Sequence, residues 1–358
     1  MAQPHSRRHQ FHPLRVGSVD ELSDDSVAIT FAVPDDLSEE YRFVHGQHLT
    51  IRGDDGERRS FSICTSPRSG RLTIGVKKLP GGAFSEGVVG TLHVGDELDV
   101  MTPAGRFTTR LDPTSRKTYV AIAAGSGITP ILSIVSTLLE EEPHAQVMLV
   151  YANRTHRSVM FLEDLHDLKD RFPTRFQLVH VLSREQQDVE LFSGRLDGDR
   201  LSRILKSLLP AEEVDEWFLC GPQQMVVDLR QVILDHGVDA HAVHTELFHA
   251  DPAPRAVEAA ASTVEGAARV TIRLDGRTTD FDLRPDGVGV LEAALAIRSD
   301  LPFACRGGVC GTCRAKLVEG TVVMDVNYAL EPEEIEQGYV LTCQSHPTSE
   351  RVVLDYDA

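Results

Sequence analysis

The segment Cys305-Arg306-Gly307-Gly308-Val309-Cys310-Gly311-Thr312-Cys313 determines what the C-terminal region of this chain must fold around. Its three cysteines follow the spacing C-x4-C-x2-C, and a fourth, Cys343, stands alone further along the chain. Plant-type [2Fe–2S] clusters take their four ligands in this order. Glycine is dense here because it adopts the backbone angles that a wrapping loop needs and lets amide N–H groups approach the sulfurs. The segment therefore predicts an iron–sulfur cluster and the transfer of single electrons.

Two other uses of cysteine are the alternatives to a cluster. A zinc site with four cysteine ligands usually shows two short CxxC pairs, whereas the last cysteine of this set has no near neighbour. A disulfide framework is typical of small secreted domains. Six cysteines in 358 residues are sparse, and a chain of this length does not need disulfides to stabilise its fold. Iron analysis separates the cluster from the zinc site.

The composition is that of a soluble globular protein, with 41% hydrophobic and 25% charged residues, and the length predicts two or three domains. The formal charge of −18 disfavours nucleic acid or an anionic membrane as partner. The acidic surface could attract a basic protein partner, or its charges could simply be solvated. No apolar run approaches the roughly 18 residues of a membrane span, and the N-terminal arginines precede no apolar segment. We expect a cytoplasmic protein.

Changes in sequence pattern and composition divide the chain into four segments. Residues 1–112 contain short β-forming segments between Gly, Asp and Pro turns, which predicts a small antiparallel barrel. Residues 113–248 alternate apolar strands with helical stretches, which predicts an α/β domain with a parallel sheet. Residues 249–267 are rich in Ala, Pro and Glu, which is typical of a linker. Residues 268–358 combine strands, one short helix and the four cysteines.

Two motifs in the barrel region have the chemistry of a flavin site. Arg59-Ser60-Phe61-Ser62 offers a cation for a pyrophosphate and an aromatic ring for an isoalloxazine. Gly81-Gly82-Ala83-Phe84-Ser85 offers N–H groups and a hydroxyl to phosphate. Phe61 could instead belong to the core, and the glycines could form a plain hairpin turn. The order of the motifs, ahead of an α/β domain, favours flavin binding.

Two further motifs lie where apolar strands give way to helices. Ala124-Gly125-Ser126-Gly127-Ile128-Thr129-Pro130 is a Gly-rich turn that lets a dinucleotide pyrophosphate approach a helix N-terminus. Cys220-Gly221-Pro222 falls at the sheet edge where doubly wound folds bind ligands. A tight strand–helix turn is the alternative for the first motif, and Cys220 could be only a small buried side chain.

The ordered set RSFS, GGAFS, AAGSGITP, LSRE, LCGP and ELF resembles the ferredoxin-NADP reductase superfamily, and the appended cluster domain resembles oxygenase reductases with a C-terminal ferredoxin. The resemblance spans nearly the whole chain. It implies a multidomain fold: an antiparallel β-barrel for FAD, a parallel-sheet α/β nucleotide domain, and an α+β ferredoxin-like (β-grasp) domain. Within this class, FHPL, YANRTHRSVMFLEDL and the C-terminal tail resemble the reductases that serve phenylacetyl-CoA epoxidases in aerobic phenylacetate catabolism, although these matches are less specific than the cluster spacing.

The resemblance carries functions over to individual residues. It assigns FAD to Arg59, Phe61, Ser62, Gly82, Phe84 and Ser85, with Phe248 near the flavin. It assigns the nicotinamide nucleotide to Gly125, Gly127, Thr129, Pro130, Cys220, Gly221 and Pro222, and the cluster to Cys305, Cys310, Cys313 and Cys343. Ser62, Cys220 and Glu246 match positions that line the hydride-transfer pocket, although a glutamate on a terminal strand is commonly just solvated. Relatives usually have tyrosine at Phe61, so ring stacking is retained but a phenol hydrogen bond is not.

The coenzyme can be inferred from the charge near two strand ends. NADP differs from NAD by a 2′-phosphate, which needs cations or hydroxyls at that point. Ser183 and Arg184, in LSRE, match the pair that grips this phosphate in NADP-dependent relatives, and Arg154 follows another strand end. No acidic residue takes the position that would hold a free 2′-hydroxyl. We therefore expect NADPH, with NADH as the alternative because surface arginines are abundant.

The three predicted cofactors form one path for electrons. A nicotinamide gives a hydride, a [2Fe–2S] cluster accepts one electron at a time, and a flavin does both. Electrons would leave through the cluster at a potential on the order of −400 mV. A redox sensor or structural iron–sulfur protein without turnover is the non-catalytic alternative, and the flavin and nucleotide motifs weigh against it.

The electron acceptor must be another protein, because the sequence contains no HExxH, no paired ExxH and no ligand spacing among its histidines. By resemblance the acceptor is a di-iron oxygenase; a steroid hydroxylase or an aromatic-ring dioxygenase is the alternative. A run of acidic residues, Glu331, Glu333, Glu334 and Glu336, lies between the third and fourth cysteines. It is either a docking face for that partner or a solvated helix end.

Overall fold

The computed structural model describes residues 9–53, 56–78, 85, 90–248 and 266–358. These residues form two compact units. The first contains residues 11–57 and 61–248; the second contains the described residues of 1–10 and 249–358 together with 58–60. Gly82, Phe84 and all but the last two residues of the expected linker lie outside the described residues. Within the described ranges, no helix has the length and apolarity needed to cross a membrane.

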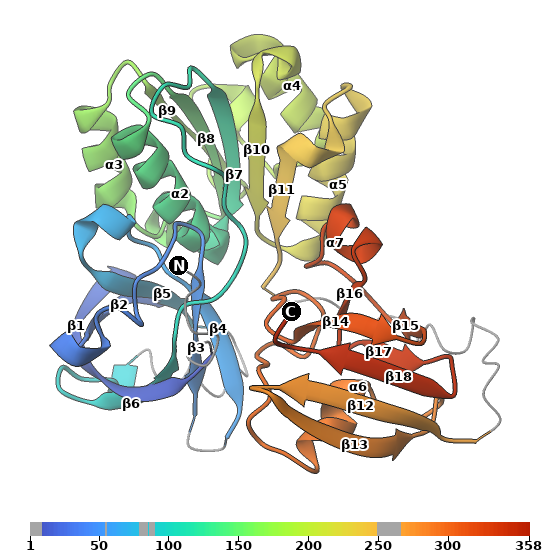
Figure 1. Cartoon of the computed structure of the whole chain (residues 1–358). Helices are drawn as coiled ribbons and strands as arrows, with labels where there is room; N and C mark the ends of the chain where they lie inside the picture. The colour runs from blue at the N-terminus through green and yellow to red at the C-terminus, as the bar shows by residue number, and fades with distance from the viewer. Residues whose placement is uncertain (1–8, 54–55, 79–84, 86–89, 249–265) are drawn as a thin grey trace. The chain divides into compact units, whose positions relative to one another are not determined.

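The N-terminal half of the first unit is a six-stranded sheet (Figure 1). Its strands are β1 (Phe11–Ser23), β2 (Ser26–Ala32), β3 (His48–Arg52), β4 (Arg58–Ser62), β5 (Leu72–Lys77) and β6 (Glu97–Met101), with 3-10 turns η2 (Asp35–Leu37) and η3 (Pro67–Ser69). The order is β4-β3-β6-β1-β2-β5, and β1 pairs antiparallel with β2 and β6. An antiparallel bridge between Ile63, just after β4, and Ile74 on β5 joins the two ends. The sheet therefore closes into the expected barrel, which leaves no free edge.

The barrel encloses its own apolar core. Leu14, Ile29, Ile51 and Ile74 are fully buried at its centre. On β1, buried Leu14 and Val16 alternate with exposed residues, as the pleat of a half-buried strand requires. This alternation, visible in the sequence, is what fixes the inner face of the barrel.

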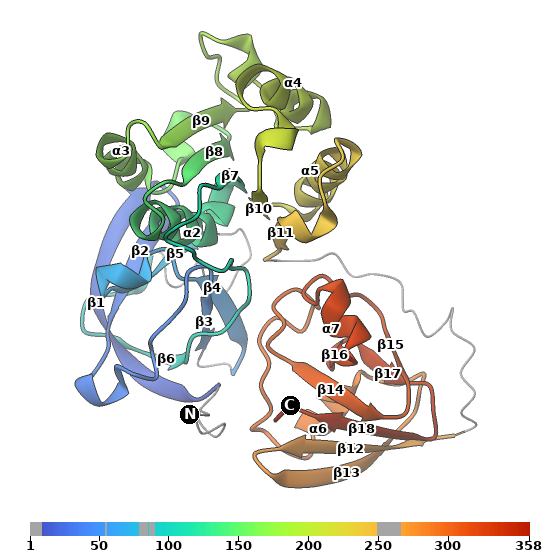
Figure 2. The ribbon, with the colours of Figure 1, turned by 45° about the horizontal axis from the view of Figure 1, so that its top comes forward.

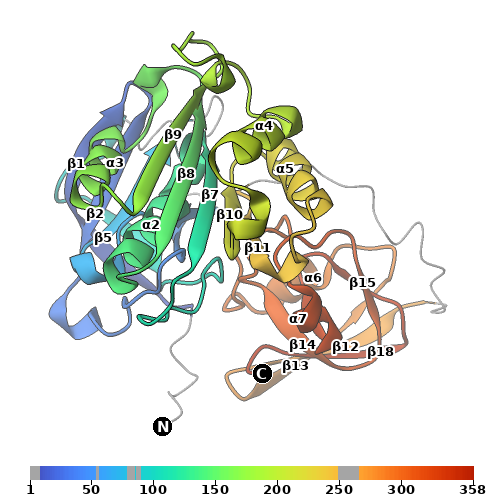
Figure 3. The same ribbon diagram turned by 90° about the horizontal axis from the view of Figure 1, so that it is seen from above.

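The second half of the first unit is a parallel five-stranded sheet in the order β11-β10-β7-β8-β9. Its strands are β7 (Thr118–Ala124), β8 (Gln146–Asn153), β9 (Phe176–Leu182), β10 (Glu216–Cys220) and β11 (Val243–Glu246). Its helices are α2 (Ile128–Glu141), α3 (Leu162–Arg171), α4 (Gly198–Leu208) and α5 (Gln223–Asp235), with 3-10 turns η4 (Gly125–Gly127), η5 (His156–Ser158), η6 (Glu190–Phe192), η7 (Ala211–Glu213) and η8 (Ala240–Ala242). Helices α2 and α3 cover one face of the sheet and α4 and α5 the other (Figure 3). The strand order reverses between β7 and β10, which makes their carboxyl ends the switch point where such sheets bind ligands.

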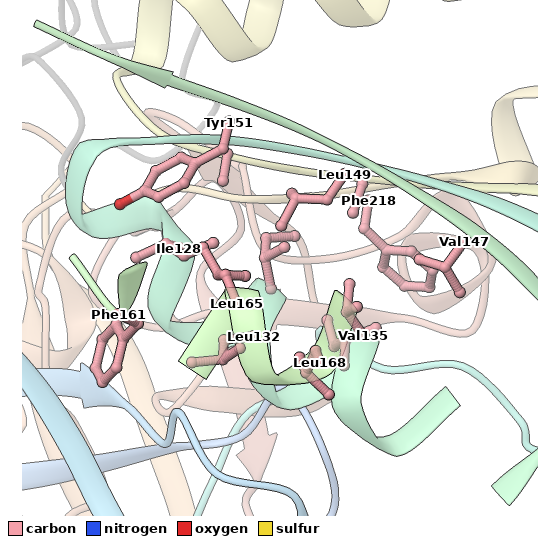
Figure 4. Packing of buried hydrophobic residues seen from close by; sticks show 14 of the residues in the cluster. Ile128, Leu132, Val135, Val147, Leu149, Tyr151, Phe161, Leu165, Leu168 and Phe218 are labelled. Atoms are coloured by element: carbon pink, nitrogen blue, oxygen red, sulfur yellow. The ribbon is translucent and has the colours of Figure 1, made fainter. Parts of the chain in front are cut away.

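Helix α2 is buried on nearly all sides because it lies between the parallel sheet and the barrel. Ile128, Leu132 and Val135 meet sheet residues such as Leu149 and Phe218 (Figure 4). The same core includes Ala28 and Cys64 from the barrel region of the chain. A continuous core of this kind packs the barrel and the α/β domain into a single compact unit.

Hydrogen bonds reinforce this internal contact. Ser133 Oγ on α2 donates to the backbone carbonyl of Thr65 at 2.7 Å, and Ser66 Oγ donates to Glu140 Oε2 at 2.6 Å. These polar groups between α2 and the barrel thus find partners, which burial there requires. The geometry of a site formed by both domains is therefore fixed.

The second unit contains a five-stranded sheet in the order β13-β12-β18-β14-β16 and a two-stranded ribbon, β15-β17 (Figure 2). Its elements are β12 (Ala268–Leu274), β13 (Arg277–Leu283), α6 (Val290–Leu295), β14 (Arg314–Glu319), β15 (Val322–Met324), α7 (Pro332–Glu336), β16 (Tyr339–Leu341), β17 (Ser345–Pro347) and β18 (Arg351–Asp355). β12 is antiparallel to β13 and parallel to β18. Val290, Leu291 and Ala294 of α6 belong to the core beneath the sheet. The expected α+β ferredoxin-like fold is confirmed.

Candidate functional site

The two glycine turns predicted as nucleotide-binding meet at the switch point of the parallel sheet. Turn η4 follows β7 and leads into α2, while Gly221 and Pro222 follow β10 and lead into α5. A Cβ on Gly127 would lie 2.3 Å from the backbone oxygen of Cys220. Only glycine permits this approach. Sequence order placed these motifs at one sheet edge, and the structure confirms that they contact each other.

The turn after β7 leads directly into the N-terminus of α2. Gly127 caps the helix without a side-chain hydrogen bond, and no acidic residue lies in the first turn. Thr129 Oγ1 is occupied, since it donates to the Ser126 carbonyl at 3.0 Å. Pro130 fits because a residue in the first turn needs no backbone donor. Gly125 has a φ of +55° and open space around its Cβ position. The Ile128 N–H donates to the Gly125 and Ser126 carbonyls within the turn, so the dipole at the N-terminus of α2 is what favours an anion here.

Ser62, Cys220 and Glu246 come from three separate strands and lie together. Ser62 Oγ donates to Glu246 Oε2 at 3.2 Å, and Cys220 is the register partner of Glu246 between β10 and β11. Ser62 and Cys220 are buried. Burial raises the pKa of the Cys220 thiol, and the nearby Glu246 carboxyl adds to this effect. Cys220 therefore stays a neutral thiol.

The carboxyl group of Glu246 is also neutral near pH 7. Burial raises its pKa to about 8, although the hydrogen bond from Ser62 partly opposes the shift. The residue as a whole is half-buried. The three side chains therefore form an uncharged polar cluster, in which Glu246 carries the most acidic proton.

The remaining flavin residues have mixed environments. Phe61 is half-buried and packs against the barrel core, so the core interpretation holds for part of its ring. Arg59 on β4 is exposed, and its Nη1 donates to the Arg58 carbonyl at 3.1 Å. Ser85 is buried, whereas Phe248 is 40% exposed. Their contacts with FAD stay predictions.

Two arginines gather beyond the ends of β8 and β9. The Ser183 N–H donates to the Asn153 carbonyl at 2.9 Å, and the Arg184 N–H donates to the Arg154 carbonyl at 2.8 Å. Both guanidinium groups belong to exposed residues, and no ion pair with another described residue engages either one. The nearby Glu185 carboxylate accepts a hydrogen bond from the His156 N–H at 2.8 Å. The pair is therefore available to a phosphate.

An ion network that the sequence did not indicate lies at the amino-terminal end of strands β7, β10 and β11. Glu216 on β10 binds Lys117 Nζ at 2.6 Å and His244 Nε2 at 3.2 Å. Burial alone would raise the pKa of Glu216, but hydrogen bonds from His244, Lys117 and Thr109 lower it to about 2. The His244 ring stacks on Phe218 with 4.9 Å between centroids. His244 is two residues before Glu246, so this network anchors the short edge strand β11. No motif or residue spacing in the sequence indicates this ion network.

In the second unit the four cysteine thiols approach one another in two pairs. The thiols of Cys305 and Cys310 are near enough to interact, as are those of Cys313 and Cys343. This interaction lowers the pKa of Cys305 and raises that of Cys310; it likewise lowers the pKa of Cys343 and raises that of Cys313. The charge on Cys310 also acts on Cys313, and that on Cys305 acts on Cys343. The lone fourth cysteine is therefore brought to the loop.

The surroundings of the thiols suit a cluster with two cysteines at each iron. The Gly307 N–H donates to Cys305 Sγ at 3.4 Å, and the Val309 and Cys310 N–H groups also point to this sulfur. Thr312 Oγ1 is buried without a protein partner in good geometry, beside Cys310. Such a hydroxyl suits a sulfur acceptor. Among the described residues, no three His, Cys, Asp or Glu are gathered around one ion-sized position.

The acidic run near the cluster has a partly structural role. Glu331 and Glu334 form a reciprocal cap at the start of α7, and Glu334 also binds Arg314 at 2.7 Å. α7 packs beside β16 (Figure 2). Glu331, Glu333 and Glu336 are exposed residues. The docking face therefore stays a prediction for these three, and Glu334 stabilises the fold.

Family models account for all three domains of the chain. The model of the oxidoreductase FAD-binding domain matches residues 13–109, and that of the oxidoreductase NAD-binding domain matches residues 121–231. The model of the 2Fe-2S iron-sulfur cluster binding domain matches residues 272–348. The predicted cofactor classes, FAD, a nicotinamide nucleotide and a [2Fe–2S] cluster, are confirmed over zinc and over a structural iron–sulfur protein.

Similar proteins cover the chain from end to end. It is 43% identical over 351 residues to a subunit of the 1,2-phenylacetyl-CoA epoxidase of Escherichia coli (strain K12), covering 97% of this chain and 98% of the relative. It is 34% identical to the ferredoxin reductase component of 3-ketosteroid-9-alpha-monooxygenase from Rhodococcus rhodochrous, covering 99% and 98%. The solved structure of phthalate dioxygenase reductase has a TM-score of 0.59 and 22% identity, covering 96% of this chain and 98% of that one, and shows the same fold.

Proposed function

Because this chain belongs to the family of oxygenase reductases that combine FAD-binding, NAD-binding and [2Fe–2S] domains, we propose that it carries electrons from NADPH to a di-iron phenylacetyl-CoA epoxidase. The observation that carries the proposal is the similarity to the epoxidase component over the full length of both chains. The protein acts in the cytoplasm, where NADPH is available and its six free cysteines suit a reducing environment.

FAD, when bound, accepts a hydride and releases single electrons to the cluster. The protein's own groups supply position and charge. The uncapped start of α2 and the glycine turns at Gly125 and Gly127 hold the dinucleotide pyrophosphate. Ser62, Cys220 and Glu246 form an uncharged wall around the reacting rings. An uncharged, shielded wall favours hydride transfer because it excludes water from the reacting atoms.

Arg154 and Arg184 select NADPH by binding its 2′-phosphate. A hydrogen bond to a charged group is worth about 1.5–3 kcal/mol, or roughly 10- to 100-fold in kcat/KM. Arg184→Ser should lower kcat/KM for NADPH by this factor and leave NADH unchanged. Arg203→Ser, an exposed arginine on α4, is the matched control. Equal losses with both coenzymes would contradict a contact with the 2′-phosphate.

The choice of acceptor is tested by reconstitution. The purified protein, with flavin and cluster bands in its visible spectrum, is reduced anaerobically with NADPH; epoxidase, phenylacetyl-CoA and oxygen are then added. Epoxidation coupled to NADPH consumption is expected. Bleaching by NADPH without epoxidation would leave the reductase assignment and exclude this partner. The similarity to the ketosteroid monooxygenase component makes a steroid monooxygenase the second acceptor to test.

A further inference from the structure

Gln344, the residue after Cys343, connects the two segments of the chain that carry the cysteines. Its side-chain Nε2 donates to the Arg306 carbonyl at 2.8 Å and lies 3.7 Å from Cys343 Sγ, with hydrogen-bond geometry to both. A primary amide has two N–H donors, so one group can serve both acceptors. The backbone of Gln344 is also fixed, since its N–H donates to the Leu341 carbonyl and its carbonyl accepts from the Asp325 N–H. The amide therefore has little freedom to move away.

The cysteine loop is shaped around this amide. Arg306 has a φ of +54°, a left-handed conformation that is unfavourable for a non-glycine residue. The carbonyl that this conformation presents is the one that Gln344 binds. Gly308, at a φ of +74°, has its Cβ position only 3.2 Å from Gln344 Cγ, so a larger residue would press on the glutamine stem. The left-handed backbone of Arg306 and the close packing of Gly308 against Gln344 are both consistent with a glutamine that bridges this loop to the fourth cysteine.

We propose that Gln344 sets the reduction potential of the cluster through its hydrogen bond to the Cys343 sulfur and holds that ligand against the cysteine loop. The inference rests on the proposed function, because it requires the cluster. Reduction adds negative charge to the sulfurs, and an N–H donor stabilises that charge, which raises the potential. Gln344 is only partly exposed, so solvent screens the interaction incompletely. The amide is thus a positioning residue for electron flow, distinct from the ligands.

Two substitutions separate the electrostatic effect from simple packing. Gln344→Met keeps the length of the side chain and removes both donors; Gln344→Glu keeps the shape but places a carboxylate beside the sulfur. The midpoint potential of the cluster should fall in the order wild type, Met, Glu. A tenfold change in the reduction equilibrium corresponds to about 59 mV for one electron, and we expect up to this shift for Met. Gln337→Met, at an exposed position after α7, should leave the potential unchanged.

The measurement is a redox titration of the holoprotein followed by EPR for the cluster and by absorbance for the flavin. Flavin potentials should stay constant, and a chelator should remove iron several-fold faster from both Gln344 variants. Faster iron loss with an unchanged midpoint would overturn the electrostatic role. If the Met variant fails to retain a cluster, Gln344→Asn, whose amide is one methylene too short to reach both acceptors, should give a smaller downward shift; an unchanged value would equally overturn the proposal. A wild-type protein without [2Fe–2S] bands would instead contradict the proposed function.

Discussion

Glu246 should give the proposed hydride-transfer site a titration that is absent from its glutamine variant. Burial raises the pKa of Glu246 from the ordinary 4.5 to about 8, and the Ser62 hydrogen bond opposes this shift. At pH 7 the carboxyl is therefore protonated, and above pH 8 it becomes a carboxylate within the pocket. Glu246→Gln removes the titration but keeps the size of the side chain and its capacity to donate and accept hydrogen bonds.

The raised pKa of Glu246 also makes the stability of the folded protein depend on pH. The folded state binds the proton more tightly than the unfolded state, so the favourable contribution is complete below pH 4.5 and is lost as pH rises to about 8. At about 1.4 kcal/mol for each pH unit, the loss is roughly 5 kcal/mol over this interval. Wild type should therefore lose stability relative to Glu246→Gln between pH 5 and pH 9.

The assay is anaerobic stopped-flow reduction of the bound flavin by NADPH from pH 6 to pH 10, with melting temperatures at the same pH values. Wild type should show an apparent pKa near 8 that Glu246→Gln lacks. Ser62→Ala should move it upward, because the Ser62 hydrogen bond favours the carboxylate. Glu163→Gln, at an exposed position on α3, serves as control. Identical pH profiles for wild type and Glu246→Gln would show that this carboxyl does not titrate in the site.

Three further substitutions test the parallel sheet that carries the site, one pair at the carboxyl ends of its strands and one residue at their amino ends. Gly127→Ala would place a Cβ 2.3 Å from the Cys220 oxygen, so we expect it to lower the free energy of unfolding by about 1–3 kcal/mol and to weaken nucleotide binding strongly. Gly125→Ala, the control, has open space at its Cβ position and should lower the free energy of unfolding by only about 1 kcal/mol. Equal losses of stability for the two variants in calorimetry would argue against the close approach of Gly127 to Cys220. Glu216→Gln should destabilise the protein at pH 7 by about 1–2 kcal/mol, because it removes the carboxylate that binds Lys117 Nζ at 2.6 Å and a hydrogen-bond partner of His244. The pKa of Glu216 is lowered to about 2, so its contribution is present above pH 4.5 and is lost as pH falls toward 2; a constant difference in melting temperature across this range would contradict the network.

Local sequence patterns were sufficient to predict the architecture of the domains. Alternating apolar residues on β1 predicted the barrel, and the alternation of strands and helices after residue 113 predicted the parallel sheet. Such patterns are legible because strand and helix periods are local properties of the chain. The domain boundaries at 112 and 248 and the linker 249–267 stay predictions. The cytoplasmic location and the choice of NADPH also remain to be tested.

The cluster of this protein could be predicted from its residues alone, because cysteine spacing is a short-range requirement of the ligand it holds, whereas FAD and the nicotinamide nucleotide were predicted from weaker motifs together with the family resemblance. What surrounds those cofactors depends on the folded chain. Glu246 obtains its raised pKa from burial beside Ser62, whose position lies 184 residues earlier in the chain, and Gln344 reaches the Arg306 carbonyl across 38 residues. Desolvation and hydrogen bonding depend on distances in space, which residue spacing does not record. The same physics explains why the Glu216 network, whose members Lys117 and His244 lie 99 and 28 residues away, left no trace in the motifs.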